Sequence, residues 1–157
     1  MERSIDKIIG NFKIEEALGF VINRASIIMR KKLTALLKEA GYHITPEEFV
    51  ILGRLWEEDG LFQTEITERT LKDKTRVTRL LGGLLEKSLI EKKTDESDRR
   101  NFRIHLTEKG KKLKYDLLPI IIKLIHTSSS NIPQSDLEIT IKTLNTIFVN
   151  LNTTSNE

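Results

Sequence analysis

Apolar residues recur every three or four positions along most of the chain, which is the spacing of amphipathic helices. The pattern predicts six helices, at residues 13–40, 46–58, 63–70, 74–88, 108–126 and 135–151. Phe102–Leu106 instead alternates strictly between apolar and polar residues, as a half-buried strand does. Leu89–Lys93 has the composition of a partner strand, and the polar residues 95–101 are expected to form the turn between the two.

Several predicted helices carry end signals of their own. Gly41 follows the first long helix, where glycine commonly adopts a left-handed conformation. Thr45 and Ser135 each precede a helix and have a glutamate three residues later, which predicts two capping boxes. Asp73 is expected to cap the 74–88 helix. These signals separate successive helices along the chain.

The central elements follow the order helix, short helix, turn, helix and two-stranded hairpin, which is that of a winged helix-turn-helix. The predicted fold is mainly α with a small β-hairpin, a winged helix-turn-helix with N- and C-terminal dimerisation helices. The expected divisions are 1–40 for an N-terminal arm and long helix, 41–110 for the winged DNA-binding domain, 111–151 for C-terminal dimerisation helices and 152–157 for a disordered tail.

The flanking helices carry more apolar surface than one chain of this length is expected to cover. The 13–40 helix is apolar most of the way round. An apolar N-terminal arm precedes it and contains Ile5, Ile8, Ile9 and Phe12. A 4-3-4-3 spacing of coiled-coil type joins Leu137, Ile141, Leu144, Phe148 and Leu151, and a second seam joins Leu113, Leu117, Ile120 and Leu124. A homodimer is expected, and a monomer core is the alternative.

The 74–88 helix has two different faces. A narrow apolar stripe is expected to pack inward and consists of Val77, Leu80, Leu81, Leu84 and Leu85. Side chains suited to DNA crowd the first two turns: Lys74, Thr75, Arg76, Thr78 and Arg79. Arginine bonds guanine through two hydrogen bonds, and threonine bonds phosphate or packs on a thymine methyl. The alternative is an ordinary amphipathic helix with a solvated basic end.

Two glycines, Gly82 and Gly83, lie inside the same helix, where each costs about 1 kcal/mol relative to alanine. They either let a phosphate backbone approach closely or fit a crowded turn. The sequence leaves both explanations open.

The tip of the predicted hairpin is strongly charged. Asp98, Arg99 and Arg100 lie at the tip, Arg103 follows on one strand, and Lys92 or Lys93 is exposed on the other. A charged ribbon of this kind lies along a DNA backbone or enters the minor groove. The alternative is a solvated β-turn.

The charge distribution favours a polyanionic partner. Residues 72–115 contain 14 Lys and Arg against 7 Asp and Glu, whereas the whole chain of 157 residues has a net charge of only +3. A basic middle between acidic ends indicates one face that meets nucleic acid.

Other function classes lack the residues they need. The chain contains no cysteine, and its histidines, His43, His105 and His126, do not have metal-ligand spacing, so neither a metal site nor a cofactor is expected. A glycine-rich phosphate loop and a catalytic constellation are both missing from the sequence, so an enzyme is not expected. No apolar stretch approaches 18 residues and the N-terminus does not resemble a signal peptide, which predicts a cytoplasmic protein without a membrane partner.

From about Ile14 to Leu151 the chain resembles the MarR-type (multiple antibiotic resistance regulator) transcription factors. The resemblance is carried by residues 65–69, 73–81 and 84–90 and, most specifically, by Asp98-Arg99-Arg100 and Leu106-Thr107-Glu108-Lys109-Gly110. Two departures are visible. Ser88 occupies a position where the family usually has glycine, and Phe62 replaces a capping threonine, so Gln63 or Thr64 is expected to cap the short helix.

The resemblance implies several properties beyond the fold. MarR-type proteins are homodimers with interleaved terminal helices, and their wing Asp orients the Arg two residues later into the minor groove; here these are Asp98 and Arg100. The family often represses transcription and often binds a small anionic aromatic effector. Arg24, between Phe20 and Ile28, is the candidate effector-binding residue, and a subunit ion pair is its alternative role.

The expected function is that of a homodimeric, sequence-specific regulator of transcription, a repressor that a small effector releases. Its partner is double-stranded DNA carrying a pseudo-palindromic operator. The competing interpretation is a winged-helix protein-interaction module without specific DNA binding.

Overall fold

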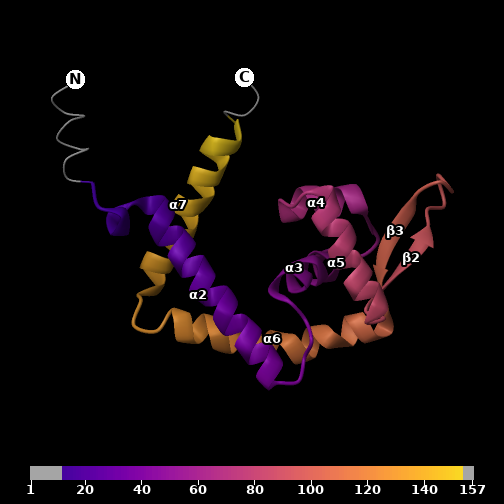
Figure 1. Ribbon diagram of the computed structural model, residues 1–157, viewed down its shortest axis with the longest axis horizontal. Coiled ribbons are helices and arrows are strands. Elements are labelled where there is room, and N and C mark those ends of the chain that lie inside the picture. The colour runs from indigo at the N-terminus through magenta and orange to yellow at the C-terminus, as the bar shows by residue number, and fades with distance from the viewer. Residues whose placement is uncertain (1–11, 154–157) are drawn as a thin grey trace. The chain divides into compact units, whose positions relative to one another are not determined.

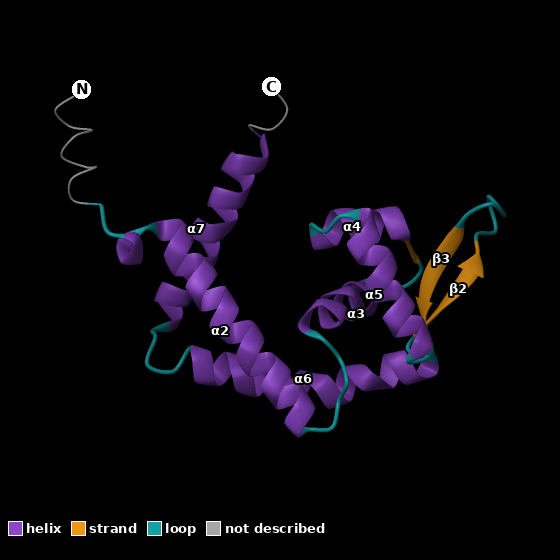
Figure 2. Ribbon diagram, viewed as in Figure 1, coloured by secondary structure: helices purple, strands orange, loops and turns teal. Residues whose placement is uncertain are grey.

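Six α-helices and a three-stranded sheet make up the part of the chain that the structure, a computed structural model, describes, residues 12–153 (Figures 1 and 2). The helices are α2 (Leu18–Glu39), α3 (Pro46–Glu57), α4 (Gln63–Thr70), α5 (Lys74–Glu86), α6 (Glu108–Ser128) and α7 (Gln134–Thr153). The strands are β1 (Leu61–Phe62), β2 (Ile90–Thr94) and β3 (Phe102–Leu106), and a 3₁₀ helix, η1 (Ile14–Glu16), precedes α2. The predicted fold class is thereby confirmed.

The chain forms two compact units, which meet between Ile121 and Ile122 within α6 and are described separately. The first contains η1 to β3 and most of α6; the second contains the end of α6 and α7. The apolar arm residues Ile5, Ile8 and Ile9, and most of the tail expected at 152–157, lie outside the described residues.

The capping signals locate the helix ends of the winged domain. The Thr45 hydroxyl accepts the backbone N–H of Glu48 (3.1 Å), and the Glu48 carboxylate accepts that of Thr45 (2.9 Å), completing the predicted capping box. Asp73 accepts the N–H of Arg76 (2.8 Å) at the start of α5. Gly41 has a φ of +82°, the left-handed conformation expected after α2.

One predicted helix start and two predicted caps were wrong, although α4 begins at Gln63 as predicted. The first long helix begins at Leu18 rather than near residue 13, because η1 and the extended Ala17 interrupt it. Phe62 itself is the N-cap of α4, since Glu65 accepts its N–H (2.7 Å) in place of a side-chain cap from Gln63 or Thr64. Ser135 lies inside the first turn of α7, where its hydroxyl donates to Asp136 (3.2 Å) rather than capping the helix.

The sheet has the order β1-β3-β2, with antiparallel pairing throughout. β3 pairs with β2 to form the predicted hairpin, or wing, and it also pairs with β1, in which Leu61 lies opposite Ile104. β1 was not predicted, because two residues are too few to show alternation. Its pairing joins the wing to the residues that immediately precede α4.

The core of the first unit is apolar and lies between the helices and the sheet. It includes the inward stripe of α5, of which Val77, Leu80, Leu81 and Leu84 are buried as predicted. Leu113 and Leu117 of α6 are also buried in this core, with Ile120 packed against it. This corrects the expectation that these residues belong to an intersubunit seam. At the start of α6, the Trp56 indole donates to the Gly110 carbonyl (3.0 Å).

Large apolar side chains are exposed on α2 and α7. On α2 they include Leu18, Val21, Ile22, Ile27, Ile28 and Met29, and Leu37 is the one residue of this helix that is buried. In the second unit, the predicted seam residues Ile141, Leu144, Phe148 and Leu151 are 38–68% exposed. No helix among residues 12–153 is long and apolar enough to cross a membrane.

Candidate nucleic-acid interface

The predicted DNA-facing side chains of α5 are all exposed, opposite its buried stripe. They are Lys74, Thr75, Arg76, Thr78 and Arg79. Because α5 packs through the stripe, these residues point away from the core of the first unit. The helix therefore presents a polar, basic face along its first two turns.

Thr78 joins the two helices of the helix-turn-helix. Its hydroxyl donates to the Lys74 carbonyl (2.8 Å) and accepts from the Gln63 side-chain amide (2.7 Å) at the start of α4. Gln63 was not among the predicted site residues. A glutamine at a helix start has no signal of its own in the sequence, because its partner is 15 residues away.

Arg76 and Arg79 have different surroundings. The Arg76 guanidinium pairs with Glu47 of α3, which also binds Lys72 (3.1 Å). The hydrogen bond from Arg76 is the main cause that lowers the pKa of Glu47, and the same bond raises the pKa of Arg76. Arg79 is exposed and takes part in no ion pair among residues 12–153. Arg79 is therefore the free arginine of α5.

The two glycines of α5 have different surroundings, which separates the two explanations left open above. A Cβ on Gly83 would lie 2.8 Å from Glu48 Oε1. Glu48 is only 4% exposed and is held by Lys87 at 2.6 and 2.7 Å, so Gly83 fits a crowded position. A Cβ on Gly82 would meet nothing within 4 Å. At 100° per residue, Gly82 shares the exposed face of Thr75 and Arg79.

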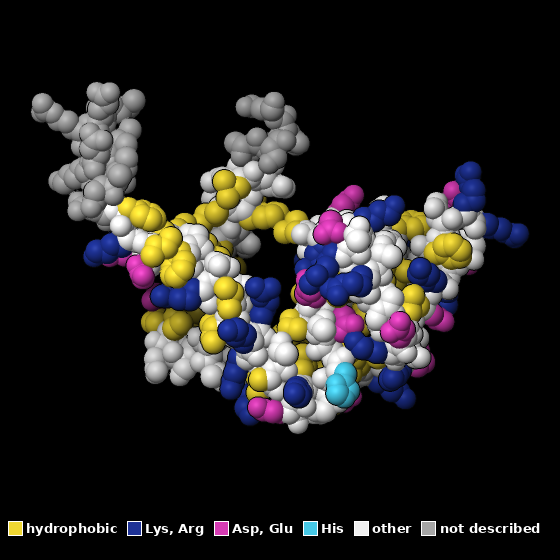
Figure 3. All heavy atoms as spheres, viewed as in Figure 1, with side chains coloured by type: hydrophobic (Ala, Val, Ile, Leu, Met, Phe, Trp, Pro, Cys, Tyr) yellow, Lys and Arg dark blue, Asp and Glu magenta, His cyan; other side chains and the backbone are white. Residues whose placement is uncertain are grey.

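The predicted pair at the wing tip is formed. Asp98 accepts three hydrogen bonds from Arg100: from its backbone N–H and from Nε, both at 3.1 Å, and from Nη2 at 3.3 Å. These bonds, with the side chain contributing most, lower the pKa of Asp98. The Arg100 side chain is nevertheless 90% exposed, and Arg99 beside it is also exposed. The tip holds Arg100 in place while leaving it accessible, and Figure 3 shows basic side chains gathered there.

Arg103, a predicted DNA-binding residue, is half-buried and is engaged by three other groups of the first unit. Its guanidinium pairs with Asp95, donates to the Gly60 carbonyl (2.9 Å) and lies over the Phe62 ring at 4.0 Å. Asp95 is only 4% exposed and was not predicted as a site residue. An aspartate in a turn commonly accepts a hydrogen bond from the backbone two residues on, and this was the available signal.

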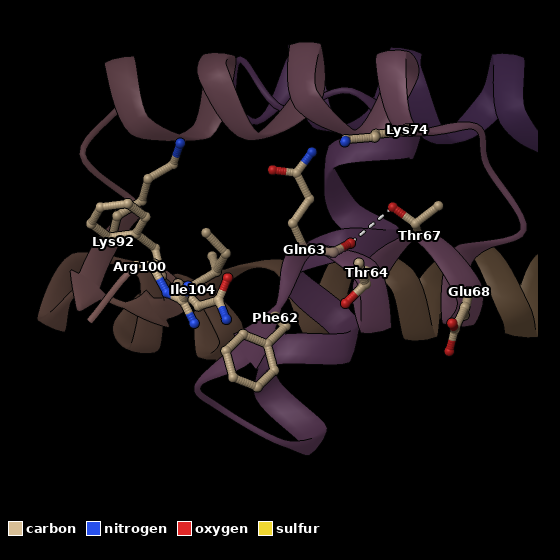
Figure 4. A pocket seen from close by; sticks show the side chains of 11 residues that line it. Phe62, Gln63, Thr64, Thr67, Glu68, Lys74, Lys92, Arg100 and Ile104 are labelled. Carbon is tan, nitrogen blue, oxygen red and sulfur yellow. Dashed lines mark hydrogen bonds between the residues drawn. The ribbon is translucent and has the colours of Figure 1, made fainter. Parts of the chain in front are cut away.

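A groove of about 380 Å³ lies between the wing and the helix-turn-helix (Figure 4). Lys74 of α5 and Lys92 of β2 lie at its two sides, and Arg100 reaches it from the wing tip. Apolar atoms of Phe62, Phe102 and Ile104 also line it. An apolar lining flanked by cations is suited to one sugar-phosphate strand, because deoxyribose is weakly polar and phosphate is anionic.

The other candidate sites are distinct from this interface. Arg24 lies on α2, with its guanidinium 5.8 Å from the centre of the Phe20 ring. A separate pocket of about 580 Å³ lies beside the loop after α2 and is lined in part by Tyr42, His43 and Lys112. Within residues 12–153 no group of three His, Asp or Glu side chains is arranged to hold a metal ion.

A helix-turn-helix with a basic second helix, joined to a β-hairpin with an arginine at its tip, defines the winged-helix DNA-binding proteins. The comparisons with known proteins are consistent with this class. Residues 32–117 match the family model of the transcriptional regulator SarA/Rot. The chain is 31% identical over 116 residues to the HTH-type transcriptional regulator SarZ of Staphylococcus aureus (strain USA300), which covers 74% of this chain and 77% of SarZ.

The chain belongs to the SarA/Rot family, whose winged-helix fold is of the MarR type. A MarR transcriptional regulator from Methanosarcina mazei Go1 is 29% identical and superposes with a TM-score of 0.73, over 85% of this chain and 94% of that one. The repressor CouR bound to a 23-mer DNA duplex shares the fold at 21% identity, with a TM-score of 0.78 over 87% and 98% of the two chains. CouR from Rhodococcus jostii RHA1 bound to p-coumaroyl-CoA has a TM-score of 0.76 at 23% identity, over 86% and 94%. These relatives are transcriptional regulators, not enzymes.

Proposed function

We propose that the protein is a homodimeric repressor that binds a pseudo-palindromic operator in double-stranded DNA. The proposal rests on the presence of two exposed arginines on one winged domain. Arg79 lies on α5 without an ion-pair partner among the described residues, and Arg100 lies on the wing, where Asp98 holds it. A winged helix-turn-helix offers these two groups to adjacent grooves of one duplex. The DNA-bound CouR relative supports the same partner.

The groove explains how the two arginines act on one duplex. With α5 in the major groove, Arg79 faces base edges and bonds guanine O6 and N7. The sugar-phosphate strand beside the major groove runs along the protein groove, between Lys74 and Lys92. Beyond that strand Arg100 enters the minor groove, where a narrow groove strengthens the negative potential. Thr75, Thr78 and Arg99 lie near enough to the same surface to contact phosphates.

Two copies are needed because one chain leaves too much apolar surface in water. The exposed face of α2 and the seam of α7 are apolar over several turns each. Joining these surfaces between subunits would bury them. Dimeric helix-turn-helix proteins bind two half-sites that lie one helical turn of DNA, or a multiple of it, apart. A palindromic operator follows from the two-fold symmetry.

We further propose that a small anionic aromatic molecule releases the protein from DNA in the cytoplasm. The ligand-bound CouR relative supports effector control in this fold. Arg24 remains the candidate for holding the carboxylate, because its guanidinium already lies beside an aromatic ring. Stabilisation against heat by benzoate and its hydroxylated derivatives, lost in Arg24→Ala and kept in Arg54→Ala, would support this role. An effect unchanged by Arg24→Ala would refute it and direct attention to the pocket at Tyr42.

The DNA role is tested by binding to genomic fragments, followed by footprinting of the bound sites. Fluorescence anisotropy then compares the operator with a scrambled duplex at one fixed salt concentration. We expect specific binding to exceed non-specific binding by at least about 10³-fold. Equal and weak binding to both duplexes would instead indicate the protein-interaction module.

The dimer is tested by sedimentation of Ile141→Glu, which places a charge on the apolar seam of α7. The matched control is Lys142→Glu, one position away on the same exposed helix. We expect dissociation or weaker association for the first variant and a dimer for the second. A wild-type protein that sediments as a monomer would contradict the proposed assembly.

A further inference from the structure

Asp95 is the buried carboxylate of an otherwise exposed charged turn. It is 4% exposed and accepts four hydrogen bonds: from the Ser97 hydroxyl, the Ser97 N–H (2.9 Å), the Asp98 N–H (2.9 Å) and Arg103 Nε. These bonds, the one from the Ser97 hydroxyl above all, hold the pKa of Asp95 far below its ordinary value. A carboxylate this enclosed cannot contact DNA, so its role lies within the wing.

Arg103 anchors the same carboxylate to the helix-turn-helix. It bonds Asp95 on one side and the Gly60 carbonyl on the other, and it lies over the Phe62 ring. Gly60 precedes β1, and Phe62 is the N-cap of α4. Arg103 therefore joins the wing tip to the segment that positions the two DNA-facing helices.

A continuous chain of contacts follows. Arg103 binds Asp95, Asp95 binds the backbone of Asp98, and the Asp98 carboxylate binds Arg100. Each contact fixes the next residue, and the last residue is the exposed arginine. The long Arg100 side chain would otherwise lose considerable rotamer freedom on entering a minor groove, a cost that prior ordering reduces.

We propose that Asp95 and Arg103 are positioning residues that fix Arg100 relative to α5, and that Arg103 does not itself bind phosphate. The proposal rests on the proposed DNA-binding function. It reassigns Arg103 from the DNA-contacting surface to the support of that surface. The reason is that its charge is already paired with a buried carboxylate.

Removal of a negative charge from the turn separates positioning from simple electrostatics. Asp95→Asn and Glu96→Gln each remove one negative charge from the same turn, but Glu96 is exposed and has no hydrogen-bond or ion-pair partner among the described residues. Electrostatics alone predicts that both variants bind DNA more tightly. Positioning predicts that Asp95→Asn binds the operator about 10-fold more weakly, while Glu96→Gln binds equally well or slightly better.

The measurement is fluorescence anisotropy on the operator and a scrambled duplex, with thermal unfolding as a check on folding. Ser97→Ala removes one of the four bonds and is expected to weaken operator binding in the same direction by a smaller factor. This variant keeps the test decisive if Asp95→Asn destabilises the wing. Tighter operator binding by folded Asp95→Asn would overturn the proposal. Unchanged operator binding by both Asp95→Asn and Ser97→Ala would also overturn it.

A double-mutant cycle with Arg100→Gln tests whether the effect runs through Arg100. We expect Arg103→Gln to weaken operator binding in the wild-type background and to have no further effect when Arg100 is already glutamine. If Arg103 bound a phosphate directly, the double variant would lose a further unit or so of salt slope. That additional loss would refute positioning.

Failure of this proposal is distinguishable from failure of the DNA-binding role. If Arg100→Gln leaves operator binding unchanged, the wing does not read DNA and the proposed function is wrong in that respect. If Arg100→Gln weakens binding but Asp95→Asn and Arg103→Gln do not, the wing reads DNA without this support.

Discussion

Gly82→Ala is expected to make the protein more stable and its DNA binding weaker. The position lies inside α5, where alanine is favoured over glycine by about 1 kcal/mol, and the new methyl group would meet no atom within 4 Å. Nothing in the first unit therefore opposes the gain in helix propensity. We expect the free energy of unfolding to rise by about 0.5–1 kcal/mol. For a chain of this size, each kcal/mol raises Tm by about 2–4 °C.

The same methyl group lies on the face of α5 that we propose meets DNA. Gly82 is three residues beyond Arg79 and seven beyond Thr75, so all three point to one side of α5. If the helix backbone approaches the duplex closely here, the added carbon separates the two surfaces and lengthens the hydrogen bonds of Arg79. A loss of about 1 kcal/mol, or about 5-fold in Kd, is expected at fixed salt.

The neighbouring glycine supplies the matched control. In Gly83→Ala the Cβ would lie 2.8 Å from Glu48 Oε1, and that carboxylate is held by Lys87 and Thr45. We expect this variant to lose about 1–3 kcal/mol of stability, while its folded fraction binds the operator normally. Urea unfolding and fluorescence anisotropy measure the two properties. If Gly82→Ala is more stable but binds the operator with an unchanged Kd, the α5 backbone does not approach the duplex closely at this position. If Gly82→Ala is less stable, the space around position 82 is not open to a methyl group.

Other substitutions probe the remaining parts of the interface. Arg79→Ala should weaken operator binding by about 1–3 kcal/mol and relax specificity at one base pair, whereas Arg76→Ala should weaken binding to all DNA sequences alike. If both variants lose the same affinity on every operator variant, Arg79 does not read a base. Asp98→Ala should weaken specific binding although it removes a negative charge, and tighter operator binding by anisotropy would show that the carboxylate does not orient the wing. Ser88→Gly should raise the free energy of unfolding by about 1 kcal/mol, since Ser88 has a φ of +55°, and a lower urea midpoint would contradict this.

The elements of the winged domain were predictable because their signals are local. The capping box at Thr45, the cap at Asp73 and the alternation of β3 each depend on residues within a few positions of one another. The bond between Asp98 and Arg100, two residues apart, was instead expected from the family resemblance. Periodicity could not show which partner covers an apolar face. It therefore did not reveal that Leu113 and Leu117 pack in the core of the first unit rather than in an intersubunit seam.

Long-range contacts decide which arginines of the proposed interface are already engaged within the chain. Arg76 and Arg79 lie one turn apart on α5 and look equivalent in sequence. Glu47, 29 residues before Arg76, nevertheless pairs with Arg76 and not with Arg79. At the wing, Arg100 and Arg103 look equally basic, yet Arg103 is engaged by a buried aspartate and a backbone carbonyl. In each pair one guanidinium is held by a carboxylate outside its own element, and the other has no such partner within the described part of the chain. We therefore expect the specificity of the proposed interface to depend on two carboxylates, Glu47 and Asp95, as well as on its cations.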